Sequence, residues 1–81
     1  MNEEILEFTI FCIDNLAEYL NKDTKEIYKL LKYDIDVIDN YIIPCYEPLH
    51  TQSKSYIVQE LVDVLKEKGA IQWHGLYQVR W

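Results

Sequence analysis

The chain has 81 residues, 49% of them hydrophobic and 14% aromatic, a composition that indicates a globular protein and excludes a disordered one. Its 14 acidic and 8 basic residues give a net charge of −6, which opposes nucleic-acid binding because such binding depends on neutralising phosphates. A single domain over residues 1–81 is expected. No apolar run approaches the roughly 18 residues that cross a bilayer, and the N-terminus is acidic where a secretory signal would be basic. Two cysteines make no disulfide framework, so a cytoplasmic location is expected.

The first predicted element is a helix over residues 3–20. Its apolar arc covers about 200° of the helical surface and contains Ile5, Leu6, Phe8, Thr9, Ile10, Cys12, Ile13, Leu16, Ala17 and Leu20. An arc of this width predicts contacts on two sides, with the rest of the domain or with another chain. Phe11 falls instead among the carboxylates of Glu4, Glu7 and Glu18. We interpret it as a candidate anchor for a protein partner, although a single exposed phenylalanine is also ordinary.

A second helix is predicted over residues 25–33, after a break at residues 21–23 and with Asp23 or Thr24 as its N-cap. The side chains expected to point inward are Ile27, Tyr28, Leu30 and Leu31. Half of all the basic residues form a row on the opposite side, namely Lys22, Lys25, Lys29 and Lys32. This row could contact an acidic surface or a phosphate backbone, and a solvated lysine face is the commoner explanation.

A third helical segment contains the apolar residues Val37, Ile38, Ile42 and Ile43, with Asp34, Asp36 and Asp39 near its start. The helix dipole favours carboxylates in a first turn. These carboxylates lack the glycine and the terminal glutamate of a calcium loop, so no metal site is predicted. Pro44 is expected to end or kink the segment, and Pro48 to keep the following chain extended.

A compact turn with His50, Thr51 and Gln52 leads into the fourth predicted helix, over residues 54–68. Ser53 is its expected N-cap and Gly69 its left-handed C-cap. The apolar face of this helix covers about 160° and contains Ile57, Val58, Leu61, Val62, Val64 and Leu65. Thr51 and Ser53 are interpreted mainly as local caps, while His50 and Gln52 are candidates for recognition of a partner.

The tail over residues 70–81 alternates with the period of a strand. One side carries Ile71, Trp73, Tyr77, Val79 and Trp81. The tail is therefore expected to be one bent strand or a hairpin that turns at His74 and Gly75. A lone strand needs another edge for pairing, and tryptophan and tyrosine are frequent interface anchors. Trp73, Tyr77 and Trp81 are accordingly candidate partner-binding residues.

No catalytic or cofactor site is predicted. Cys12 lies on the apolar arc of the first helix and is interpreted as an inert core thiol. Zinc would need Cys12, Cys45, His50 and His74 to converge without any CxxC or HxxxH pair. A nucleophilic Cys45–His50 pair has no oxyanion element near it in the sequence. We therefore predict a non-enzymatic protein without a cofactor.

Residues 1–69 resemble a family of small bacterial proteins known as domain of unknown function thirty-seven ninety-one. The most specific match is Tyr46-x-x-Leu49-His50-Thr51-Gln52, and generic helical matches are residues 4–8, 16–20, 27–31 and 56–58 with Leu61 and Gly69. Genes of this family resemble the small partner of a two-gene module whose neighbour is similar to an ADP-ribosyltransferase-like protein. The resemblance therefore implies an antitoxin-like or accessory binding role and supplies no catalytic residues. It does not extend to residues 70–81.

The order of helices before a hairpin is also similar to that of a winged helix. DNA reading is disfavoured because the outward face of the fourth helix carries Glu60, Asp63 and Glu67 against only Lys66. We therefore expect a mainly α domain of four helices with a C-terminal β-strand or hairpin, winged-helix-like in shape, that binds a protein partner. The alternatives are a structural homodimer and a DNA-binding regulator, and the contacts of such a regulator would be Lys22, Lys25, Lys29, Lys32 and Arg80.

Overall fold

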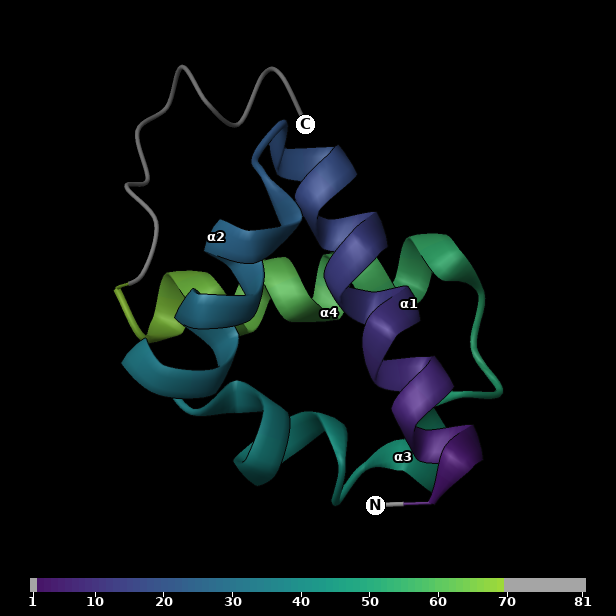
Figure 1. Ribbon diagram of the computed structural model, residues 1–81. Helices are drawn as coiled ribbons and strands as arrows, with labels where there is room; N and C mark the ends of the chain where they lie inside the picture. The colour runs from purple at the N-terminus through teal and green to yellow at the C-terminus, as the bar shows by residue number, and fades with distance from the viewer. Residues whose placement is uncertain (1, 70–81) are drawn as a thin grey trace.

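The computed structural model describes residues 2–69, which are mainly α-helical as predicted (Figure 1). Its elements are the α-helices α1 (Glu3–Leu20), α2 (Thr24–Lys29), α3 (Tyr46–Leu49) and α4 (Lys54–Glu67), and the π-helices η1 (Leu30–Asp34) and η2 (Ile38–Ile42). No strand occurs within residues 2–69. The predicted strand or hairpin, and with it the winged-helix-like shape, concerns residues 70–81 and lies outside the described residues.

Helix α1 has the predicted bounds and is closed at both ends by asparagine. The Asn2 side chain accepts a hydrogen bond from the Ile5 amide at 2.8 Å. At the other end Asn21 adopts the left-handed conformation, with φ of 57°. The Lys22 amide then donates to the Ala17 carbonyl, 2.9 Å away, which completes the Schellman arrangement of a helix end.

The second predicted helix forms over its whole length, but its latter half is a π-helix. Asp23 caps α2 as expected, accepting from the Lys25 amide at 3.0 Å, but from Leu30 onward the chain continues as the π-helix η1. The Ile35 amide donates to the Leu30 carbonyl, five residues earlier, at 3.0 Å. Leu31 is fully buried, as predicted, whereas Tyr28, also predicted to point inward, lies in the preceding α-helical part and is 42% exposed.

The chain between η1 and α4 is more helical than predicted. Asp36 takes a left-handed conformation between the two π-helices, with φ of 54°, and Pro44 follows the end of η2 as expected. Pro48, predicted to keep the chain extended, instead lies inside α3. A proline fits there because the first turn of a helix has no internal acceptor for its amides.

Helix α4 follows the prediction closely. The Ser53 hydroxyl accepts from the Tyr56 amide at 3.2 Å, and Gly69 is left-handed with φ of 70°. The helix ends at Glu67, one residue before the predicted end. No helix within residues 2–69 is long and apolar enough to cross a membrane.

One hydrophobic core joins the elements. Helix α1 packs against α2 and α4, and α4 crosses behind α1 in Figure 1. The largest fully buried side chains are Cys12, Leu16, Leu31, Val37, Ile38, Ile42, Ile57, Leu61, Val62 and Leu65. The apolar arc of α1 is only partly covered, since Leu6 is 47% exposed and Ile10 48% exposed. The two-sided contact predicted for α1 therefore leaves one flank uncovered within the described residues.

Candidate functional site

Four rings from two helices meet at the N-terminal end of α1. Phe8 and Phe11 come from α1, Tyr46 begins α3, and His50 follows its last residue. Figure 1 shows α3 beside the first turns of α1. We call Phe8, Phe11, Tyr46 and His50 the aromatic corner.

The aromatic corner consists of two stacked pairs that meet nearly at right angles. The Tyr46 and His50 rings are 4.3 Å apart at 7°, and the Phe8 and Phe11 rings are 6.1 Å apart at 17°. Phe8 meets Tyr46 edge-on at 5.4 Å and 75°, and meets His50 at 6.5 Å and 82°. Edge-to-face and offset-stacked contacts at these separations are the favourable ones. The rings therefore hold each other in place.

The backbone of the turn fixes His50 in this arrangement. Its Nδ1 lies 2.8 Å from the Tyr46 carbonyl oxygen, and because a carbonyl only accepts, Nδ1 carries the hydrogen. The Thr51 hydroxyl donates to the Pro48 carbonyl at 2.9 Å, and the Gln52 amide to the Leu49 carbonyl at 3.1 Å. Thr51 and Ser53 thus act as local caps, as predicted.

The surroundings of the aromatic corner are negatively charged. Partial burial, and then the carboxylates of Glu4, Glu47 and Glu7, raise the pKa of Tyr46. Glu4, Glu7 and Glu47 are all exposed, and none of them forms an ion pair with a cation within residues 2–69. The corner therefore combines apolar ring surface with carboxylates that are available to a cation.

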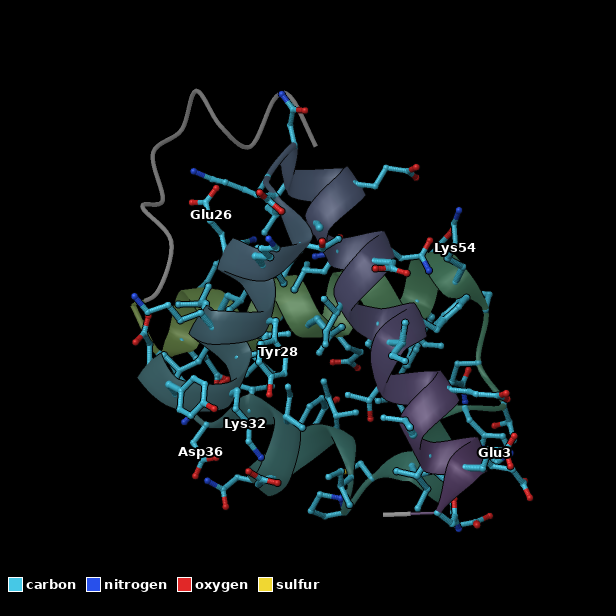
Figure 2. All side chains as sticks on the ribbon, in the orientation of Figure 1. Glu3, Glu26, Tyr28, Lys32, Asp36 and Lys54 are labelled. Atoms are coloured by element: carbon cyan, nitrogen blue, oxygen red, sulfur yellow. The ribbon has the colours of Figure 1, made fainter. Side chains whose placement is uncertain are left out.

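A second surface lies between α1 and α2. It is a shallow apolar groove of about 290 Å³, lined by Ile10, Ile13, Asp14, Thr24, Lys25 and Tyr28. Figure 2 shows Tyr28 on the side of α2 that faces α1. The Tyr28 ring also meets Tyr33 edge-on, with centroids 6.2 Å apart. The exposed flank of α1 at Leu6 and Ile10 thus continues toward this groove.

The predicted lysine row is not intact. Lys32 Nζ lies 2.9 Å from Asp39 Oδ2, and this pairing raises the pKa of Lys32. Lys32 therefore lies beside Asp39 of η2, and not on the open helix face on which the predicted row was drawn. Lys22, Lys25 and Lys29 are exposed, and Arg80 lies outside the described residues.

The described cysteines and acids form no cluster that could hold a metal ion. Burial raises the pKa of the Cys12 thiol to about 12, so at neutral pH it is a protonated core group. Cys45 is half-buried and free. Between Asn2 and Gly69 no three His, Cys, Asp or Glu side chains converge to hold a metal ion.

The structure brings together two of the six predicted partner-binding residues. Phe11 and His50 join one surface through Phe8, whereas the exposed Gln52 side chain forms no hydrogen bond with that surface. The other three, Trp73, Tyr77 and Trp81, lie outside the described residues. Sequence reasoning missed Phe8 and Tyr46. The available signal was the helical spacing of Tyr46 four residues before His50.

Comparison with known proteins gives one result. The model of a family described as "Protein of unknown function (DUF3791)" matches residues 7–68. This range contains all four residues of the aromatic corner and the Tyr46–Gln52 motif. No match was found among curated proteins or among solved structures.

Proposed function

The chain belongs to the family of proteins of unknown function DUF3791, and from this premise we propose that it is a non-enzymatic module that binds a basic protein partner. The aromatic corner is the observation that carries the proposal. Its outermost phenylalanine, Phe11, is 38% exposed and is surrounded by glutamates. Aromatic side chains of this kind supply much of the binding energy at protein interfaces.

The aromatic corner suits this role because its rings are already ordered. Phe11 stacks on Phe8, and His50 is held by Tyr46 through both its ring and a hydrogen bond. Rings that are fixed before binding lose little rotamer freedom on binding. The net charge of −6 would also accelerate encounter with a basic surface.

The partner favoured by the family resemblance is an ADP-ribosyltransferase-like protein encoded by the adjacent gene. In this proposal the chain has an antitoxin-like or accessory role in the cytoplasm and covers a basic surface of that protein. Trp73, Tyr77 and Trp81 of the C-terminal segment are proposed as further anchors beside Phe11.

Co-purification tests the proposal directly. The tagged chain and the product of the adjacent gene are co-expressed, and stoichiometric recovery of the second protein is expected. Phe11→Ser should weaken the complex about tenfold or more, because truncating a hot-spot aromatic costs about 2 kcal/mol or more. Tyr33→Ser is the matched control, since Tyr33 is a 69% exposed aromatic on η1, away from α3. Equal binding by both variants would overturn the role of the aromatic corner.

A structural homodimer is the second candidate. The exposed flank of α1 at Leu6 and Ile10 favours it, since contiguous apolar surface often marks a contact between chains. Sedimentation of the isolated protein should then give the mass of a dimer, and Ile10→Asp should return it to a monomer. A monomeric wild-type protein would exclude this candidate.

The DNA-binding alternative has the least support from the described residues. Lys32 is paired with Asp39, so the exposed lysine row is reduced to Lys22, Lys25 and Lys29. Binding to duplex DNA that falls steeply with salt would support it. Recovery of the protein free of nucleic acid, with no such binding, would remove it.

A further inference from the structure

We infer that the aromatic corner is a recognition site for an arginine side chain presented by the partner, an inference that rests on the proposed protein-binding function. The planar guanidinium would lie against the exposed rings of Phe11 and His50. The glutamates at the edge of the corner would receive its N–H groups. The site is thus expected to bind a group that is both cationic and planar.

The first step of the argument is charge. Glu4 and Glu7 on α1 and Glu47 on α3 surround the corner, and all three act electrostatically on the Tyr46 hydroxyl. Within the described residues no lysine or arginine neutralises them. An anionic or purely apolar ligand would leave these carboxylates uncompensated, whereas a cation would pair with them.

The second step is the ring geometry. The two stacked pairs of rings meet where Phe8 contacts Tyr46, at an angle of 75°. Ring faces and ring edges are therefore both present at this place. A cation is attracted to the face of an aromatic ring by the ring quadrupole. Phe11 and His50 are the exposed members, so they offer the surface that such a group can reach.

The third step separates arginine from lysine. A guanidinium is planar, stacks on aromatic rings, and carries several donors in a fixed fork that matches carboxylates. An ammonium is compact and more strongly hydrated. Tyr46 stacks on one face of the His50 ring, at 4.3 Å and 7°, so a planar guanidinium would continue this stack on the opposite face of His50.

Titration of the isotope-labelled full chain with short capped peptides tests the inference by NMR. Three peptides are compared: glycine-arginine-glycine, its lysine counterpart, and its citrulline counterpart, which is planar but uncharged. The arginine peptide should shift the signals of Phe11, Tyr46 and His50, with a Kd about threefold or more below that of the lysine peptide. The citrulline peptide should not saturate the site.

Two variants distinguish the contributions of rings and charge. His50→Ala removes an exposed ring, and Glu47→Gln removes a charge while keeping all four rings; each should raise the Kd of the arginine peptide about threefold or more. Tyr33→Ala should leave it unchanged. Equal Kd values for arginine and lysine peptides, or shifts confined to other parts of the chain, would overturn the inference.

The outcome is separable from that of the co-purification experiment. If the partner is captured in a Phe11-dependent manner but the arginine peptide shows no preference, the arginine inference fails and the proposed function stands. If capture does not depend on Phe11, the proposed role of the aromatic corner fails, and the inference that rests on it is withdrawn with it.

Discussion

His50 contacts Tyr46 twice: its ring stacks on the tyrosine at 4.3 Å, and its Nδ1 donates to the tyrosine carbonyl at 2.8 Å. The two residues lie one helical turn apart, at the ends of a helix that is only four residues long. A helix this short is marginal by itself, because nucleating one turn is unfavourable. The side chain of His50 therefore helps to hold α3 closed while forming part of the aromatic corner.

Two substitutions at His50 should separate these contributions. His50→Phe keeps a ring for stacking and removes the hydrogen bond, so we expect retained partner affinity and a loss of about 0.5–1 kcal/mol in the free energy of unfolding. His50→Asn keeps a donor and removes the ring, so affinity should fall while stability changes little. Urea denaturation and the affinity of the complex measure the two effects, and identical behaviour of both variants would contradict the assignment.

Ser53 should contribute measurably to the stability of α4. Its hydroxyl accepts from the Tyr56 amide at 3.2 Å, so Ser53→Ala leaves that amide without its cap. We expect a loss of about 1 kcal/mol, or roughly 4–8 °C in Tm for a domain of this size. Ser55→Ala, at the second residue of the same helix, is the matched control and should lower Tm little. An unchanged Tm for Ser53→Ala would refute the capping role.

Asn21 should respond differently to two small replacements. Its φ of 57° lies in the left-handed region, where glycine is unstrained and alanine is not. Asn21→Gly should leave the free energy of unfolding nearly unchanged, whereas Asn21→Ala should lower it by about 1 kcal/mol. Thermal unfolding of the two variants side by side provides the measurement. Equal Tm values would show that the end of α1 tolerates another conformation.

Cys12 should make the protein sensitive to alkali. Burial raises the pKa of its thiol from 9.0 to about 12, so the folded state favours the neutral thiol. The stability that this provides is present below pH 9 and is lost as pH rises from about 9 toward 12. The difference in unfolding free energy between wild type and Cys12→Ala should therefore shrink by about 1.4 kcal/mol per pH unit in this range.

Parallel pH profiles of the wild type and Cys12→Ala would exclude this effect. An independent check is thiol labelling of the native protein. Cys12 is fully buried and should not react, whereas the half-buried Cys45 provides the reactive reference within the same molecule.

The elements that could be predicted from the sequence are those with long, regular periodicity and recognisable caps. Helices α1 and α4 have both, and Asp23, Ser53 and Gly69 occupy the expected cap positions. The prediction of a helix holds from Leu30 to Asp34, but it missed the π-helical turn there, because a helical projection assumes 100° per residue. The prediction failed at Pro48 because a proline that would break a helix interior is compatible with its first turn.

The candidate site shows a different limit of sequence reasoning. The position of Phe11 among carboxylates predicts a partner-binding residue, and so does the place of His50 in the turn. Nothing in the sequence indicates that the two belong to one surface. Phe8 and Tyr46 join them through contacts between segments far apart along the chain. Phe8 lies on the apolar arc of α1 and packs against the core as that position predicts, but the arc gives no sign of its contacts with Tyr46 and His50. Such long-range contacts follow from packing, which local periodicity does not encode.

The two π-helices have a consequence for the length of the chain. The amides of Ile35 and Ile43 each reach back five residues, to Leu30 and Ile38, where an α-helix would reach back four. Each π-helix therefore accommodates one residue more than an α-helical turn. Deleting a single residue there would leave a turn that an α-helix can adopt. Within residues 2–69, η1 and η2 are thus the helical segments where a one-residue deletion should disturb α1 and α4 least.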